Sequence, residues 1–434
     1  GVALTDALIG TFVSADDLQA NRCFLYHLIG NGTGQWRVPQ GGMGAFVTEL
    51  NRVALLNGAE INLNSHVTDI DSSSNGVAVS TASGDKYVAT DLLFAGAPQT
   101  LAKLRGKNAP ASLDGSQMKI NMLLSKLPRL KSGVDPKLAF AGTFHVNETY
   151  SQLEKAYQVA KLGDIPSDLP LEMYCHTLTD PTILSPELSQ RGFHTLTLFG
   201  LHTPAALFDA DPSGAKEAAK AAAISSLNQY LEDPIESVLA VCGDGSLAIE
   251  AKSPIDLDND LGLPRGNIFH RDLDFPFIDG TESAPIKWGS ETDDAHIYLA
   301  GAGARRGGGV SGIAGHNAAM AVLAAVMATV MDCWNWGGRV LLKIGCLNVA
   351  AASWKLLRPV SCLFGLRGGV RRGDQCLQLA ALIHLCHDVA AAQKLAVDIQ
   401  LRNGWPVCIF LDALTNFRII QHVNGDDFFR FTGL

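Results

Sequence analysis

The order of apolar and polar residues predicts a chain that alternates between helices and short strands. Residues 44–56 have a helical period that places Phe46, Leu50 and Val53 on one face. Asn57-Gly58 directly after them is typical of a helix end. We therefore expect an amphipathic helix near the start of the chain, with its apolar face against a sheet.

Short strand-like runs follow this helix. Asn75-Gly76 and Ser83-Gly84 are typical hairpin turns between them. The predicted strands are residues 60–63, 67–70, 77–80, 87–88 and 92–94. This spacing predicts a β-meander attached to an α/β layer.

The middle of the chain has a different pattern. Residues 118–127 alternate between apolar and polar, as in a half-buried strand, and residues 171–176 and 194–199 are two further predicted strands. Helices are expected at residues 150–162 and 215–231. The chain between residues 106 and 290 is thus predicted to be a mixed α+β block placed between two α/β pieces.

A glycine-rich turn connects an apolar strand and an alanine-rich helix within residues 297–323. Its glycines are Gly301, Gly303, Gly307, Gly308, Gly309, Gly312 and Gly315. Residues without a Cβ let backbone amides approach a ligand, and a helix N-terminus favours an anion. The turn therefore predicts a cofactor site, and the alternative is a tight turn with close helix–strand packing. The apolar run 318–331 in the following helix is too short to span a bilayer and predicts a buried helix.

A second glycine cluster precedes the first predicted helix. Gly41, Gly42, Met43 and Gly44 form it, and their amides are a further candidate for cofactor binding. The alternative is a flexible entry into the helix.

The candidate catalytic residues are Arg305 and His270. Arg305 and its neighbour Arg306 lie inside the glycine turn, where they either pair with a phosphate or carboxylate or are merely solvated. His270 follows a turn at Gly266. The other histidines show no metal-ligand spacing, so we predict no metal site.

No convincing dinucleotide fingerprint GxGxxG is found. Arg306 stands where the third glycine after Gly301 and Gly303 is needed. Residues 243–248 fit GxGxxA, but Ser253-Pro254 leaves too little room for a crossover helix.

Composition narrows the class of protein. A net charge of −9 argues against a nucleic-acid partner held by electrostatics. Nine cysteines without a CxxC pair are typical of reduced thiols in an intracellular compartment. Beyond residue 331 the chain has no glutamate, and its eleven Lys and Arg exceed its seven Asp. This change predicts a boundary there and a tail of different composition.

Several segments resemble one flavoprotein family. GGMGAFVTELNRVALLNGAEINLNSHVTDI and IYLAGAGARRGGGVSGIAGHNAAMAVL resemble the phytoene-desaturase-like family. LAFAGTFHVNETYSQLEKAY, LTDPTILSP and LGLPRGNIFHRDLD resemble its pyridine nucleotide-disulphide oxidoreductase domain-containing protein 2 branch. The resemblance covers roughly residues 4–328. In the tail, KLAVDIQLRNGWPVCIFLDALTNFRIIQHVNG faintly resembles the RNase-H-like segment of plant retroelements, without its acidic cluster, so no nuclease activity is expected.

The resemblance implies an amine-oxidase-type FAD-binding domain that is interrupted by a mixed α+β substrate domain. Residues 41–105 and 291–330 would form the FAD-binding domain, and residues 1–40 and 106–290 the substrate domain, with 331–434 as the tail. By resemblance the cofactor-binding residues of the late motif are Gly301, Ala302, Gly303, Gly308, Gly309, Val310, Gly312 and Asn317, and Val67 lies beside the adenine.

The family also has an N-terminal βαβ unit that these 434 residues do not show. We therefore expect a truncated FAD-binding domain without its central strand, and weak or absent FAD binding. The predicted activity is hydride transfer between a small apolar substrate and FAD. The alternatives are a polyene desaturase or isomerase at a membrane surface, and a non-catalytic remnant with a binding or regulatory role. The family branch implies a mitochondrial location, and the sequence does not fix the oligomeric state.

Overall fold

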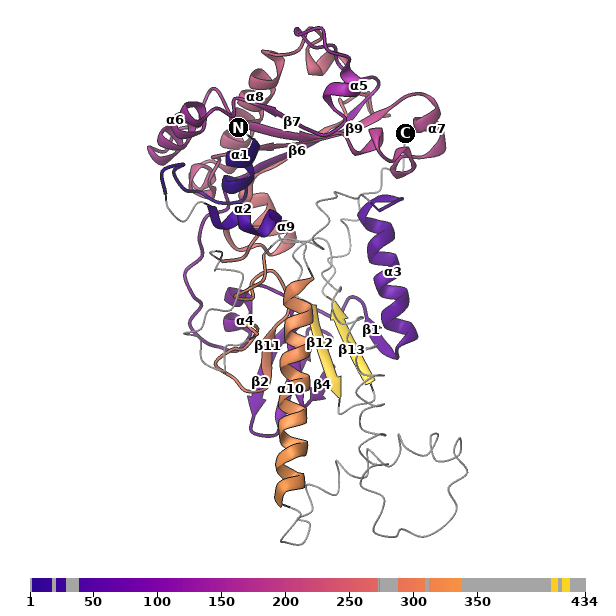
Figure 1. The fold of residues 1–434 in the computed structure, drawn as a ribbon, viewed down its shortest axis with the longest axis vertical. Coiled ribbons are helices and arrows are strands. Elements are labelled where there is room, and N and C mark those ends of the chain that lie inside the picture. Colours follow the sequence, from indigo (N-terminus) through magenta and orange to yellow (C-terminus); the bar gives the residue numbers. More distant parts are fainter. Residues whose placement is uncertain are drawn as a thin grey trace.

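The protein has two lobes in the computed structural model (Figure 1). The structure describes residues 2–17, 21–28, 39–271, 273, 288–308, 312–336, 407–412 and 416–421. The helices are α1 (Val2–Leu8), α2 (Asn21–Leu28), α3 (Gly42–Leu56), α4 (Pro98–Leu104), α5 (Pro136–Ala139), α6 (Tyr150–Lys161), α7 (Pro186–Gln190), α8 (Pro212–Asn228), α9 (Pro254–Leu261) and α10 (Ile313–Trp336). The strands are β1 (Ala59–Asn62), β2 (Val67–Ser73), β3 (Gly76–Thr81), β4 (Lys86–Ala89), β5 (Asp91–Phe94), β6 (Met118–Leu124), β7 (Thr143–Val146), β8 (Leu171–Tyr174), β9 (His194–Gly200), β10 (Ile249–Lys252), β11 (Ile297–Leu299), β12 (Val407–Asp412) and β13 (Asn416–Gln421).

The lower lobe in Figure 1, here called the parallel-sheet lobe, is built around a sheet with the strand order β1-β13-β12-β5-β11. β11 pairs with β5 in parallel, and β1 pairs with β13 in parallel. β12 is antiparallel to both of its neighbours. We expected this sheet to lack its central strand. In the structure β12 and β13, which belong to the tail, lie between β1 and β5 and fill that position. Their backbone groups satisfy sheet edges that would otherwise be left unpaired.

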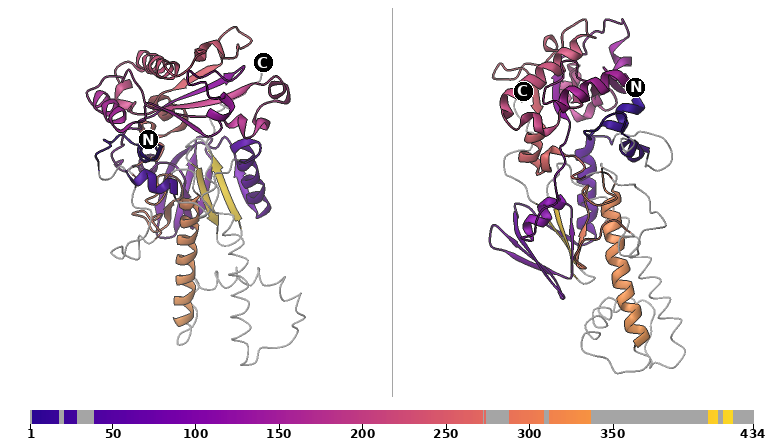
Figure 2. Two further views of the ribbon diagram at one scale, coloured as in Figure 1. Left: turned by 45° about the horizontal axis from the view of Figure 1, so that its top comes forward. Right: turned by 90° about the vertical axis from the view of Figure 1, so that its left-hand side faces the viewer.

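The two faces of this sheet carry different layers. Leu92 and Phe94 of β5 point to one face, where they pack with the three-stranded sheet β2-β3-β4. Leu93 points to the other face and packs with Ala318 and Val322 of α10. Figure 2 shows α10 on one side of the sheet and the three-stranded sheet on the other. Alternation along β5 thus explains why its four residues are all buried.

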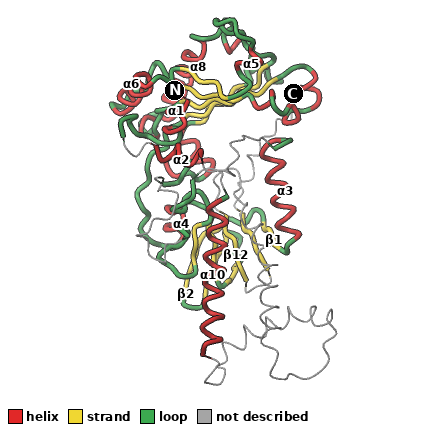
Figure 3. The backbone as a smooth tube through the Cα atoms, in the orientation of Figure 1, coloured by secondary structure: helices red, strands yellow, loops and turns green. Residues whose placement is uncertain are grey.

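The upper lobe, here called the antiparallel-sheet lobe, has the strand order β10-β6-β9-β8-β7. All of its neighbouring strands are antiparallel. α8 packs on one face through Ala219, Ala223 and Leu227, which are fully buried. These strands lie in sequence between β5 and β11, so the mixed α+β block has a sheet of its own (Figure 3).

Most predicted elements are confirmed. α3, α6 and α8 match the predicted helices, and the strands predicted at 67–70, 77–80, 118–127, 171–176 and 194–199 are present within a few residues. The meander prediction was wrong for residues 60–63, because β1 belongs to the mixed five-stranded sheet of the parallel-sheet lobe. The strands β7 and β10 were not predicted.

The prediction of a buried helix at residues 318–331 was only half right. α10 is buried around Ala318 and Val322, but Met327 is 43% exposed. Figure 1 shows the reason: the helix runs on past the end of the sheet.

The GxGxxA match at residues 243–248 is a hairpin turn. Val241 and Leu247 form an antiparallel bridge, and Gly245 has φ +85° at the tip. Pro254 then starts α9 directly after β10, with Ser253 as its cap. The structure thus agrees with the sequence argument against a crossover at this motif.

Candidate functional site

The glycine turn, residues 301–308, connects β11 to the start of α10. Several of its amides are used within the turn: Ala304 donates to the carbonyl of Gly301 at 3.0 Å and Gly308 to that of Ala302 at 3.0 Å. Gly307 donates to Ala304 at 2.9 Å, and Arg305 donates to Gly289 at 2.8 Å. These four N–H groups therefore have acceptors in the chain itself, so a ligand would have to use the other amides of the turn.

Three of the glycines are required by close packing. A Cβ on Gly301 would lie 2.1 Å from the carbonyl oxygen of Ala95, and a Cβ on Gly303 would lie 2.4 Å from Cδ of Pro98. A Cβ on Gly307 would lie 2.4 Å from the carbonyl oxygen of Ala302 within the turn itself. The tight-turn alternative accounts for these three positions without a cofactor.

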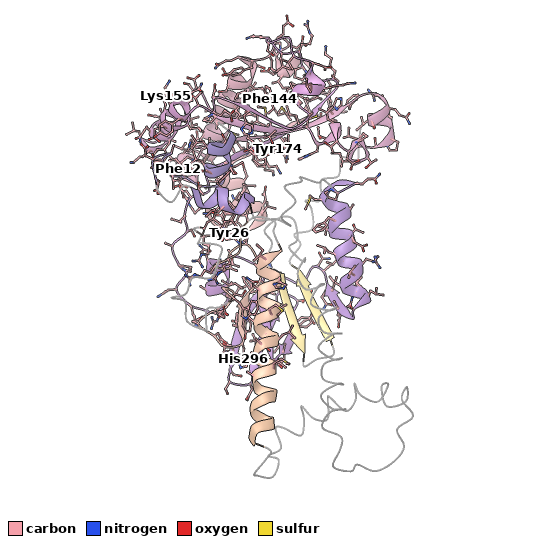
Figure 4. The ribbon with its side chains drawn as sticks, in the orientation of Figure 1. Phe12, Tyr26, Phe144, Lys155, Tyr174 and His296 are labelled. Carbon is pink, nitrogen blue, oxygen red and sulfur yellow. The ribbon has the colours of Figure 1, made fainter. Side chains whose placement is uncertain are left out.

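Gly308 has φ +83° and is approached by side chains. A Cβ there would lie 2.7 Å from Cδ2 of Leu273 and 3.0 Å from Cε1 of Tyr26. Figure 4 shows Tyr26 between α2 and the upper end of α10. Both contacts come from side chains, which can rotate away, and not from backbone.

Unpaired polar atoms surround the turn. Within the described part of the chain, Oε1 of Gln99, Nδ1 of His270 and Oγ of Ser290 are buried and have no hydrogen-bond partner. Gln99 is on α4 and donates through Nε2 to the carbonyl of His270 at 3.1 Å. Ser290 accepts from the amide of Leu299 at 2.7 Å through its own carbonyl. Buried polar atoms normally find a partner, so these three fit a bound polar molecule beside the turn.

His270 is part of this group. Its Cβ lies 3.4 Å from the position of a Cβ on Gly303. Burial lowers the pKa of its imidazole to about 4, so the ring is neutral at pH 7. Its φ of +61° is rare for a residue with a side chain. The structure thus holds a neutral imidazole, in a strained backbone conformation, against the predicted cofactor turn.

The other predicted residues of the late motif are placed as follows. Val67 belongs to the same buried cluster as Ala304 and Ala314. Nδ2 of Asn317 donates to the carbonyl of Trp288 at 2.9 Å. Arg305 is half-buried. Gly309 and Val310 lie outside the described residues. Arg306 is only 4% exposed, so the solvated alternative is wrong for it.

The earlier glycine cluster contacts the other lobe. The amide of Gly41 donates to Oδ2 of Asp180 at 2.6 Å. A Cβ on Gly42 would lie 3.1 Å from Ile183, and Gly44 has open space around it. The described contacts of this cluster and of the glycine turn are with different segments, so the structure does not bring the two predicted cofactor turns into contact.

The carboxylate of Asp180 lies at the N-terminus of α3, where an anionic ligand would otherwise bind. Its pKa is lowered by the hydrogen bond from Thr182 and by the amides of Gly41 and Gly42. Sequence reasoning missed Asp180, although an Asp before Pro181 is a typical helix-cap signal. No sequence pattern indicated a role for Gln99 or Ser290, because their burial depends on the tertiary structure alone.

The described residues contain no group of three His, Cys, Asp or Glu side chains that is suited to a metal ion. In the same residues no helix is both long and apolar enough to cross a bilayer.

Residues 8–121 match the family described as flavin containing amine oxidoreductase. Over these residues the chain is similar to that family.

Among individual proteins, an uncharacterized protein of Mycobacterium tuberculosis is 47% identical over 335 residues. This alignment covers 75% of this chain and 62% of that protein. Pyridine nucleotide-disulfide oxidoreductase domain-containing protein 2 of Mus musculus is 29% identical over 343 residues, which are 73% of this chain and 57% of that protein. The chain thus spans less than two thirds of the length of these relatives.

One solved structure is also similar. It is an oxidoreductase from Methanosarcina mazei with 14% sequence identity and a TM-score of 0.47, and the alignment covers 75% of this chain and 64% of that one.

Proposed function

We propose that the chain is an FAD-dependent oxidoreductase that moves a hydride between a small apolar substrate and the flavin. The observation that carries the proposal is the group of unpaired buried atoms of Gln99, His270 and Ser290 around the glycine turn. The match of residues 8–121 to a flavin family supports FAD as the molecule that pairs with them.

The residues of the site have separate tasks in this proposal. Bound FAD supplies the hydride acceptor, and the protein supplies binding, orientation and electrostatics. Gly312, which has φ +72°, lets the backbone approach the cofactor. Gln99 offers an acceptor. The neutral ring of His270 offers a donor or an acceptor without bringing a charge into the buried site.

Two observations favour a second function, which is binding without catalysis. Four amides of the turn already have acceptors in the chain, and Asp180 already occupies the start of α3. Both contacts reduce the number of donors for an anionic cofactor. We therefore expect FAD binding by this chain to be weak, and the polyene desaturase alternative has no further support from the described residues.

A titration of the purified chain with FAD, followed by flavin fluorescence anisotropy, tests the proposal. We expect saturable binding that Gly312→Ala weakens. Gly133→Ala is the matched control, because Gly133 has φ +73° and Gly312 has φ +72°, and Gly133 has open space around it. Both variants carry the same backbone strain. The proposal is wrong if FAD shows no saturable binding, or if the two variants bind it equally well.

A further inference from the structure

The first described segment of the chain packs on the outside of the antiparallel-sheet lobe. It consists of α1 and the residues that follow it, and we call residues 2–17 the strap. Leu8 of α1 is 1% exposed and forms one cluster with Leu153 of α6 and with Leu201, which follows β9. Three further residues of the strap pack against this cluster: Leu4, Val13 and Ala15. The strap therefore covers one side of α6 and the end of β9.

The imidazole of His202 lies beneath the strap. The residue is 1% exposed, and both ring nitrogens are buried without a hydrogen-bond partner among the described residues. The ring of Phe12, which belongs to the strap, meets the imidazole edge-on with centroids 6.2 Å apart. The ring of Tyr157 on α6 meets it in the same way at 5.7 Å. Figure 4 shows Phe12 on the same side of the lobe as Lys155 of α6. His202 is thus enclosed by two aromatic rings, of which one belongs to the strap.

A carboxylate of α6 binds the strap directly. Oε2 of Glu154 accepts a hydrogen bond from Oγ of Ser14 at 2.8 Å and from the amide of Ala15 at 3.1 Å. Partial burial raises the pKa of Glu154, but the hydrogen bonds from Gln158 and from the strap outweigh this effect, so the pKa is lowered overall. The carboxylate is therefore ionised at neutral pH, and both of its bonds to the strap are charge-assisted.

Other titratable or charged groups also lie around the strap. They are Glu148 at Thr5, His145 at Glu148, Tyr150 at Asp16, and Lys161 over the ring of Tyr157. The imidazole of His202 itself is governed by two effects. Burial lowers its pKa to about 4, and the negative charge of Glu154 opposes this shift only in part. The ring beneath the strap is therefore neutral at pH 7.

Opening of the strap changes the environment of this ring. When Phe12 moves away, the imidazole of His202 meets water, where an imidazole has a pKa of about 6.5. The closed strap thus holds a neutral ring, whereas the open strap exposes a ring that binds a proton below pH 6.5. A state that binds more protons gains population as the pH falls. Opening therefore becomes easier in acid, mainly between pH 6.5 and pH 4.

We propose that the strap is a pH-sensitive element that opens locally, as a unit, when His202 takes up a proton, while the antiparallel sheet stays folded. The enclosure of His202 by Phe12 couples the proton to the strap, and the hydrogen bonds of Glu154 keep the strap closed at neutral pH. This inference goes beyond the proposed oxidoreductase and does not depend on FAD.

Amide hydrogen exchange of the full chain without FAD tests the proposal, with each rate divided by the intrinsic rate of that amide at the same pH. The amides of Thr11 and Ala15, which donate to Leu8 and Glu154, report on the strap. We expect their opening constant to rise roughly 25-fold from pH 7.5 to pH 5, which follows from an imidazole pKa of 6.5 when exposed and about 4 when covered. The amides of α8 report on unfolding of the sheet, and at pH 5 they should open at least roughly tenfold less often.

His202→Asn removes the group that takes up the proton. Asparagine tolerates the φ of +58° at this position, and the opening constant of the strap should then differ by less than about threefold between the two pH values. His270→Asn is the matched control. His270 is also buried, has φ +61° and has its pKa lowered to about 4, but it lies against Gly303. We expect His270→Asn to keep the full pH effect in the strap.

Glu154→Gln tests the second contact. The variant keeps an acceptor for Ser14 and Ala15 but loses the charge, so at pH 7.5 the strap should open about fivefold more often. The pH effect should remain at least as large, because His202 is still present and has lost a charge that favours its protonated form. Glu217→Gln is the control, since the side chain of Glu217 is 64% exposed on α8. It should leave the opening of the strap unchanged.

The inference is overturned if the opening constant of the strap does not change with pH, or if the strap and α8 open equally often. Both results come from the unchanged protein, so they decide the question even where a variant does not fold. Equal reduction of the pH effect by His202→Asn and His270→Asn would also overturn it, because the strap would then open only through unfolding of the whole protein.

Discussion

Oδ2 of Asp180 lies 2.6 Å from the backbone nitrogen of Gly41, so a carboxylate of the antiparallel-sheet lobe accepts a hydrogen bond at the start of α3. The helix dipole favours a negative charge at this end. The same carboxylate caps the short turn at residues 181–183 through the amide and hydroxyl of Thr182. The side chain of Asp180 therefore connects the two lobes at the glycine cluster before α3, which is the first of the two predicted cofactor turns.

We expect Asp180→Asn to lower the melting temperature by about 2–4 °C at pH 7, because the variant loses a charged acceptor at a helix N-terminus. The pKa of Asp180 is depressed in the folded protein, so its contribution is present at neutral pH. It is lost as the pH falls below about 4, and the two proteins should then melt together. Asp164→Asn, at an exposed position, is the control. A difference that persists at pH 2.5 would contradict this explanation.

His202 and His270 should make the protein less stable in mild acid. Burial lowers the pKa of both imidazoles from 6.5 to about 4. Between pH 6.5 and 4 the unfolded chain therefore binds protons that the folded chain does not, and stability falls as the pH falls. The loss is about 2 kcal/mol per histidine at pH 5.

Asparagine is a suitable replacement at both positions, because φ is +58° at His202 and +61° at His270. Urea unfolding at pH 7.5 and pH 5 should show a smaller pH effect for His202→Asn and for His270→Asn than for the unchanged protein. His66→Asn, at an exposed position, should keep the original pH effect. Equal pH effects in all four proteins would exclude these histidines as the cause.

Gly301→Ala should destabilise the protein by roughly 2 kcal/mol or more, because the new Cβ would lie 2.1 Å from the carbonyl oxygen of Ala95 and backbone would have to move. Gly142→Ala is the matched control, since Gly142 has open space around it. Its effect should stay within about 0.5 kcal/mol. Urea unfolding measures both, and equal effects would show that the strand–turn packing tolerates a side chain.

Arg105→Met should cost about 3 kcal/mol of stability. The side chain of Arg105 is 7% exposed and contacts Asp293 at 2.6 Å and Asp294 at 2.9 Å. Its removal leaves the largely buried carboxylate of Asp294 without this cation, whereas Asp293 keeps its ion pair with Lys107. Arg129→Met breaks an ion pair at a side chain that is 64% exposed, so no measurable loss is expected there. Similar losses for both arginines would contradict the role of burial.

The local patterns of the sequence were sufficient for much of the fold. A helical period over residues 44–56 predicted α3, and alternation from Met118 predicted β6, because both depend on spacing along the chain alone. The glycine turn before α10 was also predicted. Its glycines at 301 and 303, however, are explained in the structure by contacts with Ala95 and Pro98, which the sequence does not reveal.

By itself the sequence determined several helices and strands of the body and the position of the candidate cofactor turn, since periodicity and glycine spacing are local properties. Only the tertiary structure decided which atoms are buried together. It left Oε1 of Gln99, Nδ1 of His270 and Oγ of Ser290 without a hydrogen-bond partner among the described residues, and it placed the carboxylate of Asp180 on the amide of Gly41. These relationships join residues that are far apart along the chain, and tertiary packing creates them only when the chain folds.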